Sequence, residues 1–174
     1  MGVDQKCSAP AGRGAERMTG NMTVSGPMRP TNYTKRLIAT AMYSKGKAFI
    51  GAGMLVRNRG GNEYVVLHLF CQGIELVLKG IALVLDYDLF RPMIKDTLGH
   101  DLVAAAKVFI FATSARCLTP KVAAELATLS RLYRRHLLRY GTALDALIDP
   151  ATIPSGLVLR RIRALIRLAD RQMV

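Results

Sequence analysis

Residues 64–85 read YVVLHLFCQGIELVLKGIALVL, and this stretch decides the fold. Four polar side chains interrupt an otherwise nearly continuous apolar run: His68, Gln72, Glu75 and Lys79. Their spacings of four, three and four residues place them on one face of a helix. The stretch therefore predicts a long helix with a single polar stripe, which is either a membrane span or the central helix of a packed domain.

The polar stripe favours the central helix of a soluble domain. The stretch has about the 20 residues that a bilayer span requires. However, Glu75 and Lys79 lie near its middle, where a charged group costs about 2.5–3.5 kcal/mol in lipid. Their i,i+4 spacing also allows them to pair with each other in a protein interior. We expect a buried helix and no membrane span.

The charge of the chain favours an anionic partner. The chain has 174 residues, which suits one domain, and a formal net charge of +13. Residues 121–174 carry ten basic and four acidic residues, a larger surplus than that of residues 1–36 or 37–120. Such a surplus is typical of proteins that bind RNA, DNA, an acidic protein or a membrane surface. Ordinary solubility charge is the alternative that composition leaves open.

The ends and the cysteines set the organisation of the chain. Residues 1–30 are rich in Gly, Pro, Ser and Met without periodicity, which predicts a disordered tail or an over-extended start before a domain at residues 31–174. This tail has no apolar core of the kind found in a signal peptide. The cysteines Cys7, Cys71 and Cys117 have neither metal-ligand nor disulfide-framework spacing. We therefore expect a cytoplasmic protein without a metal or other cofactor.

Caps and turn residues divide the rest of the chain into further helices. Residues 31–57 predict a first helix, although Gly46 and Gly51 weaken it, and the NRGG sequence at 58–61 ends it. Asn62 is a good N-cap for the central helix. Further helices are predicted at about 100–116, at 120–140 behind a Thr-Pro start, and at 154–173. No segment alternates with period two, so the chain predicts an all-α, up-and-down bundle of four to five helices.

The sequence predicts an apolar face on two of these helices. The apolar positions of the first helix approximate one face, and the last helix has an apolar side and a basic side. The first helix places these residues on its apolar face: Leu37, Ile38, Ala41, Met42, Ala48, Phe49, Ala52 and Leu55. The last helix has Leu159, Ile162, Ile166 and Ala169 on one side and Arg160, Arg163, Arg167 and Arg171 on another. We expect this basic side either to follow an RNA backbone or to be a solvated face.

The IELVLKG sequence at 74–80, followed by GHDL at 99–102, resembles the HEPN superfamily of small helical-bundle proteins. The resemblance covers roughly residues 33–140. Its carriers are Ile74, Glu75, Leu76, Lys79, Gly99, His100, Asp101 and Leu102. It implies a HEPN-like helical bundle that forms a homodimer. It also implies a setting in prokaryotic toxin–antitoxin or defence systems, with an antitoxin or a nucleotidyltransferase as partner.

Many HEPN proteins are metal-independent endoribonucleases, and their mark is an Arg followed by four to six residues and a His. This chain matches that mark with Arg131 and His136. A histidine suits proton transfer because its pKa lies near neutrality, and an arginine suits the phosphate charge because its planar fork matches phosphate oxygens. The resemblance thus implies catalysis by these two residues. The substrate-binding residues it implies nearby are Arg134, Arg135, Arg139 and Tyr140.

Helix geometry limits this match. On one ideal helix a five-residue step turns Arg131 and His136 roughly 140° apart. They converge only if the helix bends or if two subunits each contribute one residue. The family position after the arginine is often polar, whereas this chain has Leu132.

The supporting residues also have purely structural interpretations. Glu75 and Lys79 form an internal ion pair in one interpretation and line a catalytic cleft in the other. His100 and Asp101 cap a helix or touch substrate. The leading hypothesis is a HEPN-like RNA-binding protein, and the alternative is a non-catalytic helical domain that binds a protein partner. A third possibility is a membrane-surface protein that uses the last helix.

Overall fold

The computed structural model describes residues 30–94, 98–116, 118–140 and 146–173. Every regular element within these ranges is a helix, which confirms the all-α prediction. The elements are α1 (Asn32–Asn58), α2 (Glu63–Leu85), α3 (Tyr87–Met93), α4 (Leu102–Thr113), α5 (Pro120–Arg134), α6 (Leu137–Tyr140), the 3₁₀ helix η2 (Pro150–Thr152) and α8 (Gly156–Met173). The tail predicted for residues 1–30 lies outside the described residues except for Pro30.

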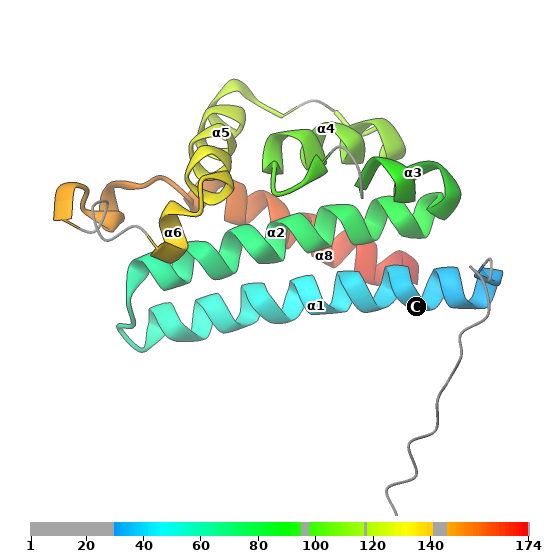
Figure 1. Ribbon diagram of the computed structural model, residues 1–174, viewed down its shortest axis with the longest axis horizontal. Coiled ribbons are helices and arrows are strands. Elements are labelled where there is room, and N and C mark those ends of the chain that lie inside the picture. Colours follow the sequence, from blue (N-terminus) through cyan, green and yellow to red (C-terminus); the bar gives the residue numbers. More distant parts are fainter. Residues whose placement is uncertain (1–29, 95–97, 117, 141–145, 174) are drawn as a thin grey trace, which may run out of the picture.

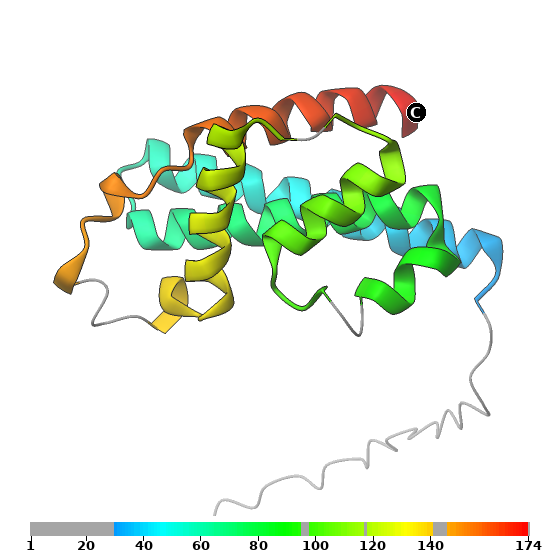
Figure 2. The ribbon, with the colours of Figure 1, turned by 90° about the horizontal axis from the view of Figure 1, so that it is seen from above.

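The central helix of the bundle is α2, as its apolar sequence predicts. It contacts α1, α3, α4, α5, α6 and α8, and it supplies the largest fully buried side chains, Phe70, Leu67 and Ile74. Figure 1 shows α1 and α2 as two long antiparallel helices, with α3, α4 and α5 on the side of α2 away from α1. Seen from above in Figure 2, α5 crosses this pair and α8 runs along it.

Among the described residues, one helix is long and apolar enough to cross a membrane, and it is α2. In the most apolar 18-residue window of this helix, 72% of the residues are buried inside the bundle. Two residues of its polar stripe are enclosed as well, because Glu75 and Lys79 are only 5% and 6% exposed. The core position of α2 therefore accounts for its composition.

Glycines allow the backbones of α1 and α2 to approach each other closely. Gly46 of α1 and Gly73 and Gly80 of α2 are buried at the interface. A Cβ atom on Gly46 would lie 2.7 Å from the Val77 nitrogen, and one on Gly80 would lie 2.8 Å from the Tyr43 Cα atom. Both atoms are backbone, so neither can turn aside. Gly46, which weakens the first helix by propensity, is thus required by the packing of the pair.

This packing changes the predicted face of α1. The helix buries a face made of small residues and two larger side chains: Ala39, Tyr43, Gly46, Ile50 and Gly53. Leu37 and Leu55, predicted to face the core, are 54% and 59% exposed. The predicted face was wrong because glycine does not usually indicate burial. In α1, however, Gly46 lies where the two helix backbones come close together.

We expect Gly80→Ala to lower the free energy of unfolding by about 1–3 kcal/mol, because the added methyl group overpacks the α1–α2 contact. The matched control is Gly51→Ala in α1, where a Cβ meets no atom within 4 Å. There alanine is expected to stabilise the protein by roughly 0.5–1 kcal/mol through helix propensity. Urea denaturation measures both variants, and equal stabilisation of the two would contradict the close packing.

Caps begin the helices at or next to the predicted positions. Asn62 Oδ1 accepts hydrogen bonds from the backbone nitrogens of Tyr64 (2.9 Å) and Val65 (3.3 Å) at the start of α2. Asp86 caps the short helix α3, which contains Pro92. Asp101 caps α4, so of the two cap candidates at 100 and 101 the aspartate is the cap.

The helix predicted at 120–140 is two helices. α5 ends at Arg134, and His136 has a left-handed backbone with φ of +56° before α6 begins at Leu137. This break could not be predicted from the sequence, because neither Gly nor Pro lies between residues 121 and 140. A left-handed conformation is uncommon for a residue other than glycine, and it redirects the chain at the very residue predicted to be catalytic.

The last helix has the two faces that its sequence predicts. Leu159 and Ile162 are 6% and 7% exposed, whereas the arginines at 160, 163, 167 and 171 are exposed. Its start is anchored on α5, because the buried Glu125 Oε1 accepts a hydrogen bond of 2.9 Å from the Val158 nitrogen. Near its end, Asp170 accepts hydrogen bonds from Tyr43 (2.8 Å) and Lys47 (2.7 Å) of α1. α8 is therefore tied to the bundle at both ends.

Candidate functional site

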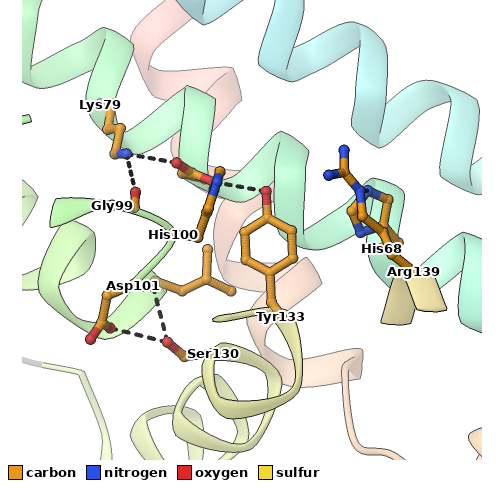
Figure 3. A network of polar contacts seen from close by, with 10 residues as sticks. His68, Lys79, Gly99, His100, Asp101, Ser130, Tyr133 and Arg139 are labelled. Atoms are coloured by element: carbon orange, nitrogen blue, oxygen red, sulfur yellow. Dashed lines mark hydrogen bonds and ion pairs between the residues drawn. The ribbon is translucent and has the colours of Figure 1, made fainter. Parts of the chain in front are cut away.

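Glu75 is the centre of a buried polar network between α2, α5 and the start of α4. Its Oε1 atom accepts a hydrogen bond of 2.6 Å from Lys79 Nζ. Its Oε2 atom accepts one of 2.8 Å from the Tyr133 hydroxyl and lies 3.1 Å from His100 Nδ1. Figure 3 shows Lys79, His100 and Tyr133 turned towards one another from three parts of the chain. The predicted internal ion pair between Glu75 and Lys79 is thus present.

The GHDL sequence is joined to this network by its backbone and its side chains. Lys79 Nζ donates a second hydrogen bond of 2.6 Å to the Gly99 carbonyl oxygen. Asp101 Oδ1 accepts from the Val103 and Ala104 nitrogens and from Ser130 Oγ, while Oδ2 lies 2.8 Å from the Arg134 guanidinium. The GHDL turn is therefore fixed to α2 on one side and to α5 on the other (Figure 3).

All three histidines of the chain gather around Tyr133 and its neighbour His100. The Tyr133 ring centroid lies 5.6 Å from that of His68 and 5.4 Å from that of His100. The His136 ring lies 5.8 Å from the His100 ring. These residues come from α2, from the GHDL turn, and from the turn between α5 and α6, so only the folded chain brings them together.

The hydrogen bonds of His100 define its chemistry. A carboxylate only accepts hydrogen bonds, so the contact with Glu75 places a proton on His100 Nδ1. The Nε2 atom of the neutral ring is then an acceptor, and the side chain is 54% exposed. Tyr133 stays a phenol because burial and the charge of Glu75 raise its pKa. The network thus presents one oriented, solvent-accessible imidazole base.

His68 lies at the half-buried end of the polar stripe. Its Nδ1 atom is buried without a hydrogen-bond partner among the described residues, and its Nε2 atom lies 3.3 Å from Arg139 Nε. Burial is the main cause that lowers the pKa of His68, and the nearby charge of Arg139 lowers it further. The side chain of Gln72 opposes this shift without cancelling it. His68 is therefore held neutral, as an acceptor for Arg139.

This lowered pKa predicts a loss of stability in acid. The unfolded chain takes up a proton at His68 as the pH falls through about 6.5, whereas the folded protein does so only at lower pH. The free energy of unfolding should therefore fall between pH 7.5 and 5.5. His68→Gln should flatten this dependence. Urea midpoints across that range measure it, and parallel curves for the two proteins would contradict the assignment.

The predicted arginines fall into two groups. Arg131, Arg134 and Arg135 line a pocket of about 210 Å³ beside Asp101 and Ser130. Arg139 lies apart from them, against His68. The side chain of Tyr140, predicted to bind substrate, lies outside the described residues. Three of the four predicted substrate-binding residues, Arg134, Arg135 and Arg139, thus lie in two separate places.

Arg131 and His136 form no hydrogen bond with each other within the described part of the chain. His136 faces His100, whereas Arg131 faces the arginine-lined pocket and makes no hydrogen bond or ion pair with a described residue. The predicted catalytic pair is therefore divided between two adjoining places on the surface. The pairing that the chain itself makes is His136 with His100.

The sequence did not predict that Tyr133 contacts Glu75 or that His100 lies beside His136. His100 had a signal, because the GHDL motif carries it, but a helix cap was its expected role. Tyr133 had none, since a tyrosine within a helix is typical of ordinary packing. Tyr133 and His136 both lie near His100 only because α5 ends between them and the chain changes direction.

The histidine cluster is not arranged as a metal site. No group of three or more His, Cys, Asp or Glu side chains among the described residues is placed to hold a metal ion. Cys71 is fully buried, and desolvation raises the pKa of its thiol, so it packs as a small apolar residue.

Comparison of the chain with protein-family models, with curated proteins and with solved structures found no match.

Proposed function

We propose that the chain is a HEPN-like RNA-binding protein that cleaves RNA without a metal ion, with His100 and His136 as the proton-transfer pair. The observation that carries the proposal is the approach of these two imidazoles to 5.8 Å, with Glu75 behind one of them. Both side chains are exposed, so a bound strand has access to them.

The chemistry needs two proton transfers. One imidazole takes the proton of the RNA 2′-hydroxyl while its oxygen attacks the adjacent phosphorus. The other protonates the departing 5′-oxygen, which leaves a cyclic 2′,3′-phosphate. A histidine pair suits both steps because neutral and protonated imidazoles coexist near pH 7. In this proposal His136 keeps its predicted role and gains His100 as its partner.

The surrounding arginines supply phosphate affinity in this proposal. Arg131 and Arg135 are exposed beside the pair and form no ion pair with a described residue. Arg134 is exposed too, although Asp101 holds its guanidinium. Guanidinium forks match phosphate oxygens in a bidentate manner. Arg131 thus holds the substrate backbone from the neighbouring pocket instead of bonding to His136.

The test is incubation of the purified protein with total RNA in EDTA, beside His136→Ala. We expect cleavage products with cyclic phosphate ends from the unchanged protein and loss of about 10²–10⁴ in rate from the variant. Lys45→Gln on α1 is the control, since it removes one exposed positive charge from a helix that contributes no residue to this cluster or to the basic side of α8. Undiminished cleavage by His136→Ala would overturn the assignment.

The second candidate is a non-catalytic helical domain that binds a protein partner, either an antitoxin, a nucleotidyltransferase or a second copy. The separation of Arg131 from His136 favours it, as do the exposed apolar side chains along α1, with Tyr33 77% and Leu37 54% exposed. In this alternative the Glu75 network only fixes helix positions. Absence of cleavage under every condition, together with a stable complex or dimer in light scattering, would favour it.

A further inference from the structure

A second cavity lies between α2, α4, α5 and α8, and none of the residues that line it belongs to the polar network or to the histidine cluster. It has a volume of about 380 Å³, with a floor from Ile74 and Leu78 of α2. Its walls come from α4, α5 and α8, and α8 lies apart from α4 here (Figure 2). This size is within the range of about 300–1,000 Å³ typical of small-molecule sites.

The lining of this cavity is apolar except for two arginines. Phe109, Leu126 and Ile162 are typical of the wall, and Arg116 and Arg161 are the only polar side chains among the described residues that line it. Both arginines are exposed, and neither forms an ion pair with a described residue. No carboxylate of the described residues lines the cavity. Its two arginines therefore have free guanidinium groups.

We propose that this cavity binds an aliphatic carboxylate of medium chain length. The apolar wall takes the hydrocarbon chain, whose burial is favourable at about 0.8 kcal/mol per CH₂ group. Arg116 and Arg161 hold the carboxylate at the mouth, because a guanidinium fork matches both of its oxygens. Protein cores are normally filled by side chains, whereas here the helices leave the space empty. Two arginines that form no ion pair with a described residue lie beside it. The site is independent of RNA cleavage.

Calorimetric titration of the full chain with decanoate tests the proposal. We expect saturable binding of one decanoate per chain. Decyltrimethylammonium, which has the same chain and the opposite charge, should bind at least about tenfold more weakly, and acetate should not bind at the same concentrations. Equal affinity for the two amphiphiles, or no saturable binding of decanoate, would overturn the proposal.

Variants locate the site. Arg161→Gln should weaken decanoate binding about fivefold or more, whereas Arg163→Gln, an exposed arginine of α8 outside the cavity, should leave it unchanged. Ala164→Trp should block the cavity, and because Ala164 is exposed its thermal unfolding should stay near that of the unchanged protein. Equal effects of the two arginine variants would overturn the assignment.

Three other occupants give different results. A synthetic Leu/Glu amphipathic peptide that binds where decanoate does not would make the space a helix-docking groove. If the protein sediments with phosphatidylglycerol vesicles, and Arg161→Gln and Arg163→Gln reduce this binding equally, then α8 is a membrane-surface helix. Self-association that Ala164→Trp abolishes would make the cavity a contact between two copies. Each of these results, without decanoate binding, overturns the proposal.

Discussion

Lys79→Met is expected to lower the free energy of unfolding by about 3–5 kcal/mol, the largest stability effect that we predict. Lys79 and Glu75 are only 6% and 5% exposed, so the carboxylate left behind is an uncompensated buried charge. Tyr133 and His100 continue to donate to it, which places the expected loss at the lower end of this range. The variant also releases the Gly99 carbonyl, and with it the GHDL turn.

Two controls separate charge from packing. Lys35→Met breaks an ion pair of the same 2.6 Å length, but with Asp88 74% exposed, so its expected cost is about 0–1 kcal/mol. The double variant Glu75→Gln with Lys79→Met removes both buried charges and should be more stable than Lys79→Met alone. Urea denaturation at pH 7 measures all three. A cost below about 1 kcal/mol for Lys79→Met would contradict the buried pair.

His100→Ala is expected to lower the rate of RNA cleavage by about 10²–10⁴, which together with His136→Ala is the largest effect on activity that we predict. The reason is the proposed proton transfer through its Nε2 atom, which the bond from Nδ1 to Glu75 leaves accessible. RNA affinity should change little, because phosphate binding is assigned to the arginines. Single-turnover cleavage gives the rate, and fluorescence anisotropy gives the affinity.

Glu75→Gln tests the support of that imidazole. Glutamine keeps the shape of the side chain but no longer favours a proton on His100 Nδ1, so we expect a smaller loss of rate and an altered pH profile. Glu75 is thus a positioning residue in the proposal. If His100→Ala cleaves at the unchanged rate while His136→Ala is inactive, the paired mechanism is wrong and His136 acts with another group.

Much of the helical order was predictable because its signals are local. Asn62, Asp101 and the Thr119–Pro120 start lie where α2, α4 and α5 begin, since capping depends on neighbours within one turn. The i,i+4 pairing of Glu75 with Lys79 was predictable for the same reason. The break at His136 was not, because its left-handed backbone lacks any local signal such as glycine.

The candidate site was predictable only in part. The sequence predicted residue types that suit acid–base chemistry and phosphate binding, and it placed the partner of His136 5 residues away at Arg131. The structure places His100 there instead, 36 positions earlier in the chain. Contacts at such separation depend on how α4 and α5 dock on α2, which no spacing rule within one helix describes.

The sequence by itself determined that this protein is helical, that 64–85 is its central helix, and that a polar stripe lies along it. Periodicity and capping specify these because they act through residues three and four positions apart. Only the tertiary structure decided that glycines bring α1 and α2 together, that Glu75 holds Lys79, His100 and Tyr133 at once, and that the histidines converge. Those arrangements depend on close packing between segments that are distant in the sequence, which no local pattern of residues specifies.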